Sequence, residues 1–216
     1  MKKVQRHRML SVAIVIVVAM SAATMGKAQT FSVLHVFASQ TGDPESPQNG
    51  VTQGGDGDLY GTSPDGGANS MGTVYKISPK GELRVLYSFC SQANCADGSD
   101  PDSGLTLRPD GHFLGTTATG GSFNQGTIFD ITQTGTLTVL YNFTGGNDGT
   151  LPTAPPIQGP DGSFYGTARN GGLPDGCGTI YKITNSGAAP GGFHLLHRFN
   201  KNRRLQSAGL ASSGYR

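Results

Sequence analysis

The stretch Asp56-Gly57-Asp58-Leu59-Tyr60-Gly61-Thr62 is the first of three copies of one phrase, and this phrase decides the fold. The other copies are Asp110-Gly111-His112-Phe113-Leu114-Gly115-Thr116 and Asp161-Gly162-Ser163-Phe164-Tyr165-Gly166-Thr167. A Gly-Gly pair follows each copy, and a Gly-Thr pair then opens a run of apolar residues. Residues 43–81 align with residues 97–135 without a gap, at an offset of 54. A repeat of this length is typical of one supersecondary unit, such as a propeller blade.

Each unit is predicted to contain four short strands. In the second unit they are residues 104–108, 112–117, 126–132 and 137–143, and an Asp-Gly pair between β-prone runs favours a hairpin. Residues 31–37, 83–89 and 193–199 are equivalent to the last strand, in which alternate side chains are expected on opposite faces. The pattern predicts an all-β, propeller-like array of about three four-stranded antiparallel blades. Because closed propellers usually have at least about four blades, we expect an incomplete propeller.

The two ends of the chain differ from the repeat region. A basic start precedes the apolar run 9–20, and Gly26-Lys27-Ala28 offers a cleavage site, so residues 1–28 are predicted to be a secretory signal peptide. The alternative is an uncleaved membrane anchor. Residues 29–200 form the repeat domain, in units of about 31–83, 84–137 and 138–200. Residues 201–216 carry no repeat and are expected to be a basic tail, either disordered or produced by a frameshift or truncation.

The net charge of the repeat region differs in sign from that of the whole chain. The first 28 residues hold five of the 16 Lys and Arg residues, and the last 16 residues hold four. Residues 29–200 therefore keep seven basic residues against all 14 acids, a net charge of −7. This acidic balance argues against nucleic acid or an anionic membrane surface as a partner.

The chain has three cysteines, and export would permit disulfides. Cys90 and Cys95 flank a four-residue insert, so a local disulfide that closes this loop is the first hypothesis, with free thiols as the alternative. The sequence offers no obvious partner for Cys177.

Several recurrent residues have a structural interpretation. The glycine before each threonine fits a strand position that another backbone or sheet approaches closely, or else a bulge. Tyr60, Leu114 and Tyr165 share one slot and are predicted to pack between blades. His35 and His197 share a slot with tyrosines and are interpreted as half-buried rings rather than metal ligands or bases, while His112 is expected to be solvated.

No established catalytic or cofactor motif is present. Calcium is the one cofactor the sequence raises, because Asp97, Asp100 and Asp102 lie close together, as do Asp56 and Asp58. The twelve-residue calcium loop pattern is missing, and turn chemistry accounts for Asp56, Asp110 and Asp161. We therefore expect no bound cofactor.

The repeated phrases resemble the GloVer-containing, choice-of-anchor tandem repeat proteins. Leu59 to Thr62, Gly126 to Ile131, Leu140 to Phe143 and Asp148-Gly149 carry the match, and the insert from Cys90 to Cys95 is similar too. The resemblance covers residues 31–199. It implies a secreted bacterial repeat protein without an established activity, often joined to a surface anchor.

The leading functional hypothesis is a secreted, non-enzymatic module that binds or scaffolds an extracellular ligand, such as a glycan or a protein. Contacts are expected in three variable loops, at Asn69 and Ser70, at Phe123 and Asn124, and at Pro174 and Asp175. One rival is an extracellular propeller enzyme that acts on polysaccharide, and another is a truncated product without function. Histidines or acids from different blades that converge on one channel would favour the enzyme.

Overall fold

The computed structural model describes residues 31–37, 40–172, 176–184 and 192–200. The chain divides into two units, residues 1–33 and 34–216, and the fold below is that of the second unit. The predicted signal peptide and basic tail lie outside the described residues. Among the residues that are described, no helix is long and apolar enough to cross a membrane.

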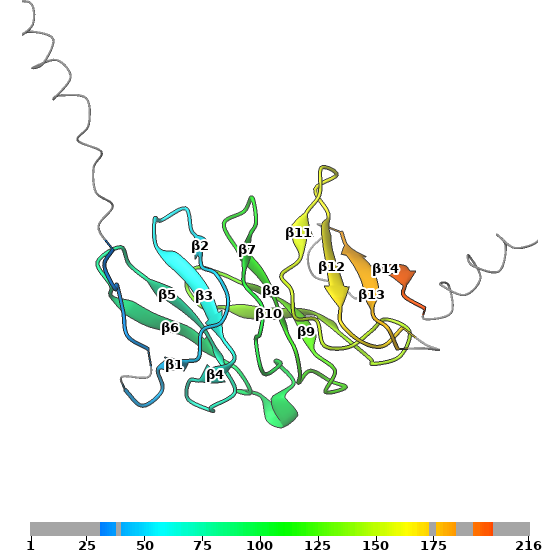
Figure 1. Cartoon of the computed structure of the whole chain (residues 1–216), viewed down its shortest axis with the longest axis horizontal. Coiled ribbons are helices and arrows are strands. Elements are labelled where there is room, and N and C mark those ends of the chain that lie inside the picture. Colours follow the sequence, from blue (N-terminus) through cyan, green and yellow to red (C-terminus); the bar gives the residue numbers. More distant parts are fainter. Residues whose placement is uncertain (1–30, 38–39, 173–175, 185–191, 201–216) are drawn as a thin grey trace, which may run out of the picture. The chain divides into compact units, whose positions relative to one another are not determined.

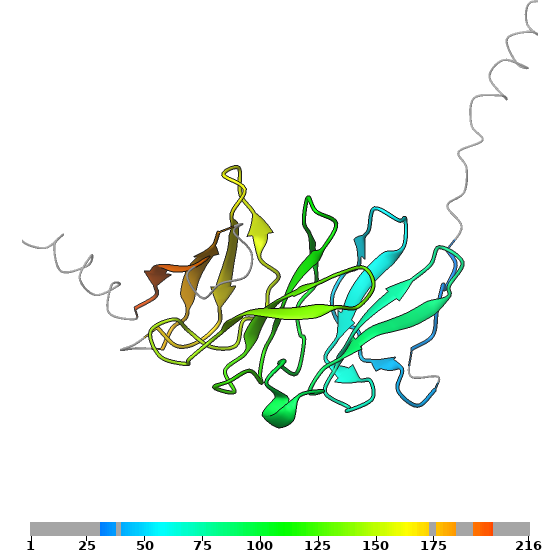
Figure 2. The same ribbon diagram turned by 180° about the vertical axis from the view of Figure 1, so that it is seen from behind.

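Three four-stranded antiparallel sheets make up the fold, as the repeat predicts. Sheet 1 contains β2 (Thr52–Gln53), β3 (Leu59–Ser63), β5 (Thr73–Ile77) and β6 (Leu83–Ser88). Sheet 2 contains β7 (Thr106–Leu107), β8 (Phe113–Thr117), β9 (Thr127–Ile131) and β10 (Leu137–Asn142). Sheet 3 contains β11 (Ile157–Gln158), β12 (Phe164–Ala168), β13 (Thr179–Ile183) and β14 (Phe193–Arg198). Strands pair in chain order within each sheet, and the sheets follow one another side by side (Figures 1 and 2).

Two small elements were not predicted. The strands β1 (Pro44–Glu45) and β4 (Asp65–Gly66) form a separate antiparallel pair beside sheet 1. A short 3-10 turn, η1 (Ala93–Cys95), follows sheet 1.

The Asp-Gly pairs form the predicted hairpin turns between the first two strands of each sheet. Gly57, Gly111 and Gly162 have φ of 87°, 85° and 77°, a region that favours glycine. The preceding aspartate accepts a hydrogen bond from the backbone N–H two residues later, as Asp56 Oδ1 does from Asp58 at 3.2 Å. This local bond is the turn chemistry that aspartate favours.

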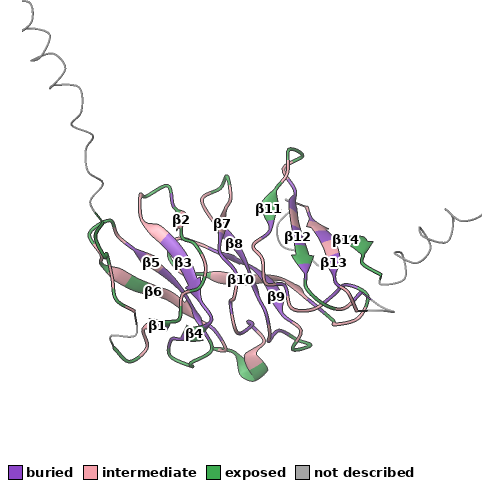
Figure 3. Ribbon diagram, viewed as in Figure 1, coloured by how far each residue is buried: buried purple, intermediate pink, exposed green. Residues whose placement is uncertain are grey.

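The cores lie between neighbouring sheets rather than inside any one of them. Between sheets 1 and 2, the fully buried Tyr60 stacks on Phe113 with ring centroids 4.2 Å apart. Between sheets 2 and 3, Leu114 takes the place of Tyr60 and packs in a buried cluster with Phe164. The predicted packing of Tyr60 and Leu114 between blades is therefore confirmed. Tyr165, in the same slot of sheet 3, is only half-buried, and Figure 3 shows more exposed residues in sheet 3 than in sheet 2.

The recurrent glycines inside the second strands, Gly61, Gly115 and Gly166, make room for aromatic rings. A Cβ on Gly61 would lie 2.6 Å from the ring of Tyr75, and one on Gly115 would lie 2.5 Å from Phe129. Gly166 meets Tyr181 in the same way. At these three positions a side chain of the adjacent strand makes the close approach. At the glycines before the third strands the predicted approach of another backbone is confirmed, since a Cβ on Gly126 would lie 2.4 Å from the carbonyl oxygen of Thr117.

Two expectations about the fourth strand were wrong. Side chains of residues 137–143 do not simply alternate, because a β-bulge lies between Val139 and Tyr141. The bulge lets Leu140 and Tyr141 pack against the same core. Residues 31–37 form no strand, since no described strand pairs with them.

Candidate functional site

The variable loops extend from closely matched frames. Ser70 and Asn124 both have φ of 55°, and their backbone N–H groups donate to Gly67 and Gly121. Asn69 donates from Nδ2 to the carbonyl of Phe89 at 2.9 Å, whereas Asn124 accepts through Oδ1 from the N–H of Gly120 at 3.1 Å. The two loops therefore share a backbone shape but present different side chains.

Exposed apolar groups stand among polar ones on these loops. Met71 is 46% exposed and Phe123 is 56% exposed. Asn69, Ser70 and Asn124 are exposed beside them. The third predicted loop position, Pro174 and Asp175, lies outside the described residues. The structure thus places four of the six predicted contact residues on exposed loops.

The linkers between sheets fasten these loops to the next sheet. Asp100 donates its backbone N–H to the carbonyl of Met71 at 3.0 Å, and Leu151 donates to Gln125 at 3.3 Å. Gly121 also donates to the carbonyl of Cys95 at 2.9 Å, so the disulfide turn contacts the loop of sheet 2. We call the loops 68–71 and 122–125, together with the turn 90–95, the loop rim. The loop rim includes η1, the short green coil drawn without a label at the lower edge of Figure 1.

The predicted disulfide between Cys90 and Cys95 is present. It closes a turn that wraps the fully buried Asp97. The Asp97 carboxylate accepts hydrogen bonds from the hydroxyls of Tyr87 and Ser91 and from the N–H groups of Ser91 and Gln92, at 2.8–3.2 Å. Burial by itself raises the pKa of Asp97, but these hydrogen bonds outweigh burial and lower the pKa below its usual value.

Asp148 repeats this arrangement without a disulfide. Its carboxylate accepts from the Tyr141 hydroxyl at 2.8 Å, and from the N–H and hydroxyl of Thr144 at 2.8 and 2.5 Å. Asp97 and Asp148 are thus structural caps for the loops that leave the fourth strands. The Asp97 carboxylate is engaged by four internal hydrogen bonds.

Charged residues gather at the opposite edge, on the Asp-Gly hairpins. In sheet 1, Lys76 pairs with Asp58 at 2.7 Å and with Asp56 at 3.4 Å. Tyr60 donates its hydroxyl to Asp56 at 2.6 Å, which lowers the pKa of Asp56. Burial, followed by this hydrogen bond, raises the pKa of Tyr60 to about 12. Sheet 3 repeats the scheme with Asp161, Tyr165 and Lys182.

Sheet 2 reverses the charges of this edge. Asp130 takes the slot of Lys76, and it accepts from Arg108 Nη1 at 2.5 Å and from His112 Nδ1 at 2.7 Å. Arg108 takes the slot of Gly54, where a Cβ in sheet 1 would lie 2.6 Å from the Tyr60 ring. The smaller Leu114 in place of that tyrosine makes space for the arginine. His112 is 41% exposed, so it is partly solvated as expected, but it is also held by Asp130.

These clusters do not combine into one chemical centre within the described residues. Each ionic cluster, on Lys76, on Asp130 or on Lys182, draws its charged groups from a single sheet. No group of three His, Cys, Asp or Glu side chains in the described ranges could hold a metal.

Burial, and then the charges of Asp102 and Asp65, raise the pKa of Asp100.

Sequence reasoning missed the reversed cluster of sheet 2. The signal was present in the alignment, because the Asp58 and Lys76 slots hold His112 and Asp130 in the second copy. Two positions that change together, here from Asp and Lys to His and Asp, indicate a contact. Cys177, left without a predicted partner, forms an isolated backbone bridge with Gly171.

The comparison with protein families settles which repeat this is. A family model described as the Gloeobacter/Verrucomicrobia repeat matches residues 19–215. The chain belongs to the Gloeobacter/Verrucomicrobia repeat family. The resemblance drawn from the repeated phrases is thereby confirmed.

Solved structures with similarity to this Gloeobacter/Verrucomicrobia repeat chain include three proteins. A virginiamycin B lyase from Staphylococcus aureus is 20% identical with a TM-score of 0.42, over 72% of this chain and 42% of that one. A proposed gluconolactonase is 15% identical with a TM-score of 0.46, over 69% and 48%. A streptogramin B lyase is 19% identical with a TM-score of 0.42, over 75% and 46%. The chain spans less than half the length of each, and no curated protein matches it.

Proposed function

We propose that this chain is the repeat region of an exported protein that binds an extracellular ligand through the loop rim, without catalysis. The observation that carries the proposal is a contrast within the loops: their backbone shape is repeated, whereas their exposed side chains differ between copies. Ser70 and Asn124 hold the same backbone angle, while the exposed side chains around them differ. Binding residues are often found on loops that a rigid scaffold positions.

The chemistry of the loop rim favours an uncharged glycan as the ligand class. Phe123 offers an exposed aromatic face, and Asn69, Ser70, Ser122 and Asn124 offer amides and hydroxyls. Aromatic faces with a few polar donors and acceptors suit a sugar ring, which has both apolar and hydroxyl surfaces. The loops 68–71 and 122–125 contain no charged residue, so nothing there selects a charged ligand.

Affinity electrophoresis through gels that contain neutral polysaccharides tests this proposal. If Phe123 is the anchor, Phe123→Ser weakens retardation about 30-fold, because truncating an aromatic anchor typically costs about 2 kcal/mol. Arg84→Ser is the control, since Arg84 is exposed in β6 and belongs neither to the loop rim nor to the ends of the array of sheets. The proposal would be contradicted if no neutral polysaccharide retards the protein, or if both variants lose retardation equally.

Export is the second part of the proposal and has its own test. The basic start, the apolar run 9–20 and the small residues Gly26 and Ala28 support it. Mass spectrometry of the chain recovered from the medium or periplasm of an exporting host should give an N-terminus at Gln29. A chain that stays in the cytoplasm with its first residues intact would contradict it.

A further inference from the structure

Both ends of the array of sheets present apolar surface. On sheet 3, Ile157, Leu196 and Phe199 are 67%, 51% and 44% exposed. On the side of sheet 1, Leu34 and Val51 are 45% and 47% exposed. Two internal junctions, between sheets 1 and 2 and between sheets 2 and 3, show what covers equivalent residues. At each junction, one face of a sheet packs against the opposite face of the next sheet in the chain.

The innermost strands supply the first equivalence. Thr52 donates its hydroxyl to the carbonyl of Leu105 in the next sheet at 2.6 Å, and Thr106 donates to Pro156 at 2.6 Å. In the third copy the threonine slot holds Ile157, and in the first copy the acceptor slot holds Val51. The two ends thus carry an apolar pair where both internal junctions carry a hydrogen bond.

The second strands continue the pattern. Tyr60 stacks on Phe113 across one junction, and Leu114 and Phe164 share a cluster across the other. The next pair in this series is Tyr165 with Leu59, and both are only half-buried. Thr167 is exposed, whereas its equivalents Thr62 and Thr116 are buried at the junctions. The ends therefore look like the two halves of a third junction.

The fourth strands show that one part of this third junction is already occupied. Phe89 meets Phe129 edge-on with ring centroids 5.2 Å apart, and Phe143 meets Tyr181 at 5.4 Å. Phe37 meets Tyr75 in the same way at 5.2 Å. Residues 34–37 thus lie over sheet 1 as the fourth strand of a preceding sheet would, although they pair with no described strand.

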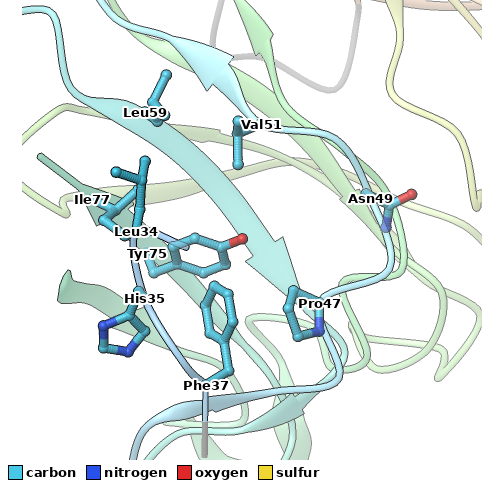
Figure 4. Close-up of a pocket in the computed structure, with 9 residues that line it drawn as sticks. All are labelled: Leu34, His35, Phe37, Pro47, Asn49, Val51, Leu59, Tyr75 and Ile77. Atoms are coloured by element: carbon cyan, nitrogen blue, oxygen red, sulfur yellow. The ribbon is translucent and has the colours of Figure 1, made fainter. Parts of the chain in front are cut away.

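A pocket marks the place of the three inner strands of that preceding sheet. It has a volume of about 380 Å³ and is lined by residues 34, 35, 37, 47, 49, 51, 59, 75 and 77 (Figure 4). Within the described residues, two buried atoms on its lining, His35 Nε2 and Asn49 Nδ2, have no hydrogen-bond partner. Pro47 also lines the pocket. The equivalent prolines, Pro101 and Pro152, instead lie next to Gly72 and Gly126 of the preceding sheet.

We propose that a second copy of this chain docks head-to-tail here, with its sheet 3 against sheet 1. Two identical junctions of this kind close a ring of six sheets from two chains, within the four to eight blades typical of propellers. Charge favours the contact: residues 40–88, which include sheet 1, carry six acids and three Lys or Arg residues, whereas residues 152–199, which include sheet 3, carry two acids and three Lys or Arg residues.

Docking requires residues 34–37 to give up their place to β14 of the second copy. The two segments have the same pattern, since Leu34, His35 and Phe37 match Leu196, His197 and Phe199. β14 is paired with β13 at five positions, whereas residues 34–37 are unpaired in the described structure. The unpaired segment is the easier one to displace. Residues 34–37 therefore serve as a temporary cover for the docking face.

Mass measurement on the full chain tests the proposal. Light scattering behind size exclusion, repeated over a range of concentrations, should give twice the mass of one chain. Ile157→Arg and Val51→Arg should each weaken association by at least about 100-fold, because each buries an unpaired charge against an apolar surface. Phe123→Arg is the control, as a similarly exposed apolar residue away from both ends, and it should leave the mass unchanged.

A charge-pair variant makes the test specific. Ile157→Glu or Val51→Lys alone should weaken association, and the double variant Ile157→Glu/Val51→Lys should restore it, because each junction then carries an opposite pair. Far-UV circular dichroism checks that every variant is folded. A single-chain mass for the folded original sequence at all concentrations would overturn the proposal. So would a dimer that resists Ile157→Arg.

Discussion

Replacing Asp130 by Asn should destabilise the chain far more than the same change at Asp58. Asp130 and its partner Arg108 have side chains only 10% exposed, and their atoms lie 2.5 Å apart. Removing one partner of a buried ion pair leaves an uncompensated charge and typically costs about 3–5 kcal/mol. Asp110 stays 3.0 Å from Arg108 and partly compensates, although it is 47% exposed. We therefore expect a loss of about 3 kcal/mol for Asp130→Asn, at the low end of that range.

Asp58→Asn is the matched comparison in sheet 1. The Lys76 and Asp58 side chains are 22% and 21% exposed, and Lys76 keeps a second partner in Asp56. Surface pairs contribute about 0.2–1 kcal/mol, and this partly exposed pair is expected near the upper end of that range. Asp58→Asn should therefore cost less than about 1 kcal/mol.

Urea denaturation followed by circular dichroism measures both losses on the same scale. In thermal melts, a loss of about 3 kcal/mol corresponds to roughly 6–12 °C in a chain of this size. The m-value should not change, since neither substitution alters the surface exposed on unfolding. Equal losses for the two variants would refute the claim that the reversed cluster of sheet 2 is a buried ion pair.

Three further predictions concern Asp97, Gly115 and the disulfide. Because the pKa of Asp97 is lowered, the unfolded chain takes up the proton first as the pH falls, so stability should drop below about pH 4, and Asp97→Asn should flatten that dependence in pH-dependent melts. Gly115→Ala should cost about 1–3 kcal/mol in urea denaturation through overpacking against Phe129, whereas Gly55→Ala, with open space around it, should stay within about 0.5 kcal/mol. Reducing the disulfide between Cys90 and Cys95 should cost about 2 kcal/mol, and an unchanged melting temperature would contradict its role in capping Asp97.

The repeat made most of the fold predictable because its residues act locally. The Asp-Gly pairs determine hairpins through φ above zero, as at Gly57, and this needs no knowledge of distant residues. Comparison among copies extended the prediction to the junctions. A slot shared by Tyr60 and Leu114 indicated a buried, apolar position without a fixed polar role, and both proved to lie between sheets.

The errors arose where a residue depends on a neighbour that the sequence does not identify. Residues 31–37 have the strand pattern but lack a described pairing partner, so the pattern did not produce a strand. The bulge between Val139 and Tyr141 brings Leu140 to the same core as Tyr141, and strict alternation cannot foresee such a shift. At His112 and Asp130 the alignment of the copies carried a signal that was overlooked, and the pairing of β8 with β9 brings the two residues into contact.

Differences among the copies divide into those the structure explains and those it leaves free. The change from Gly54 and Tyr60 to Arg108 and Leu114 is explained, because the ring that excludes a side chain is gone and an ion pair fills the space. The change from threonine to Ile157 is not compensated by any contact among the described residues that buries the side chain, since Ile157 is 67% exposed. Ile157 is exposed together with Leu196 and Phe199 at the same end of the array, and such a group of apolar residues is typical of an interaction surface. Phe123 is 56% exposed on a backbone frame that two copies share, beside the exposed polar groups of the loop rim. The two residues lie on different surfaces, so a ligand on the loop rim and a second chain at the ends can bind independently, and a variant at one should leave binding at the other unchanged.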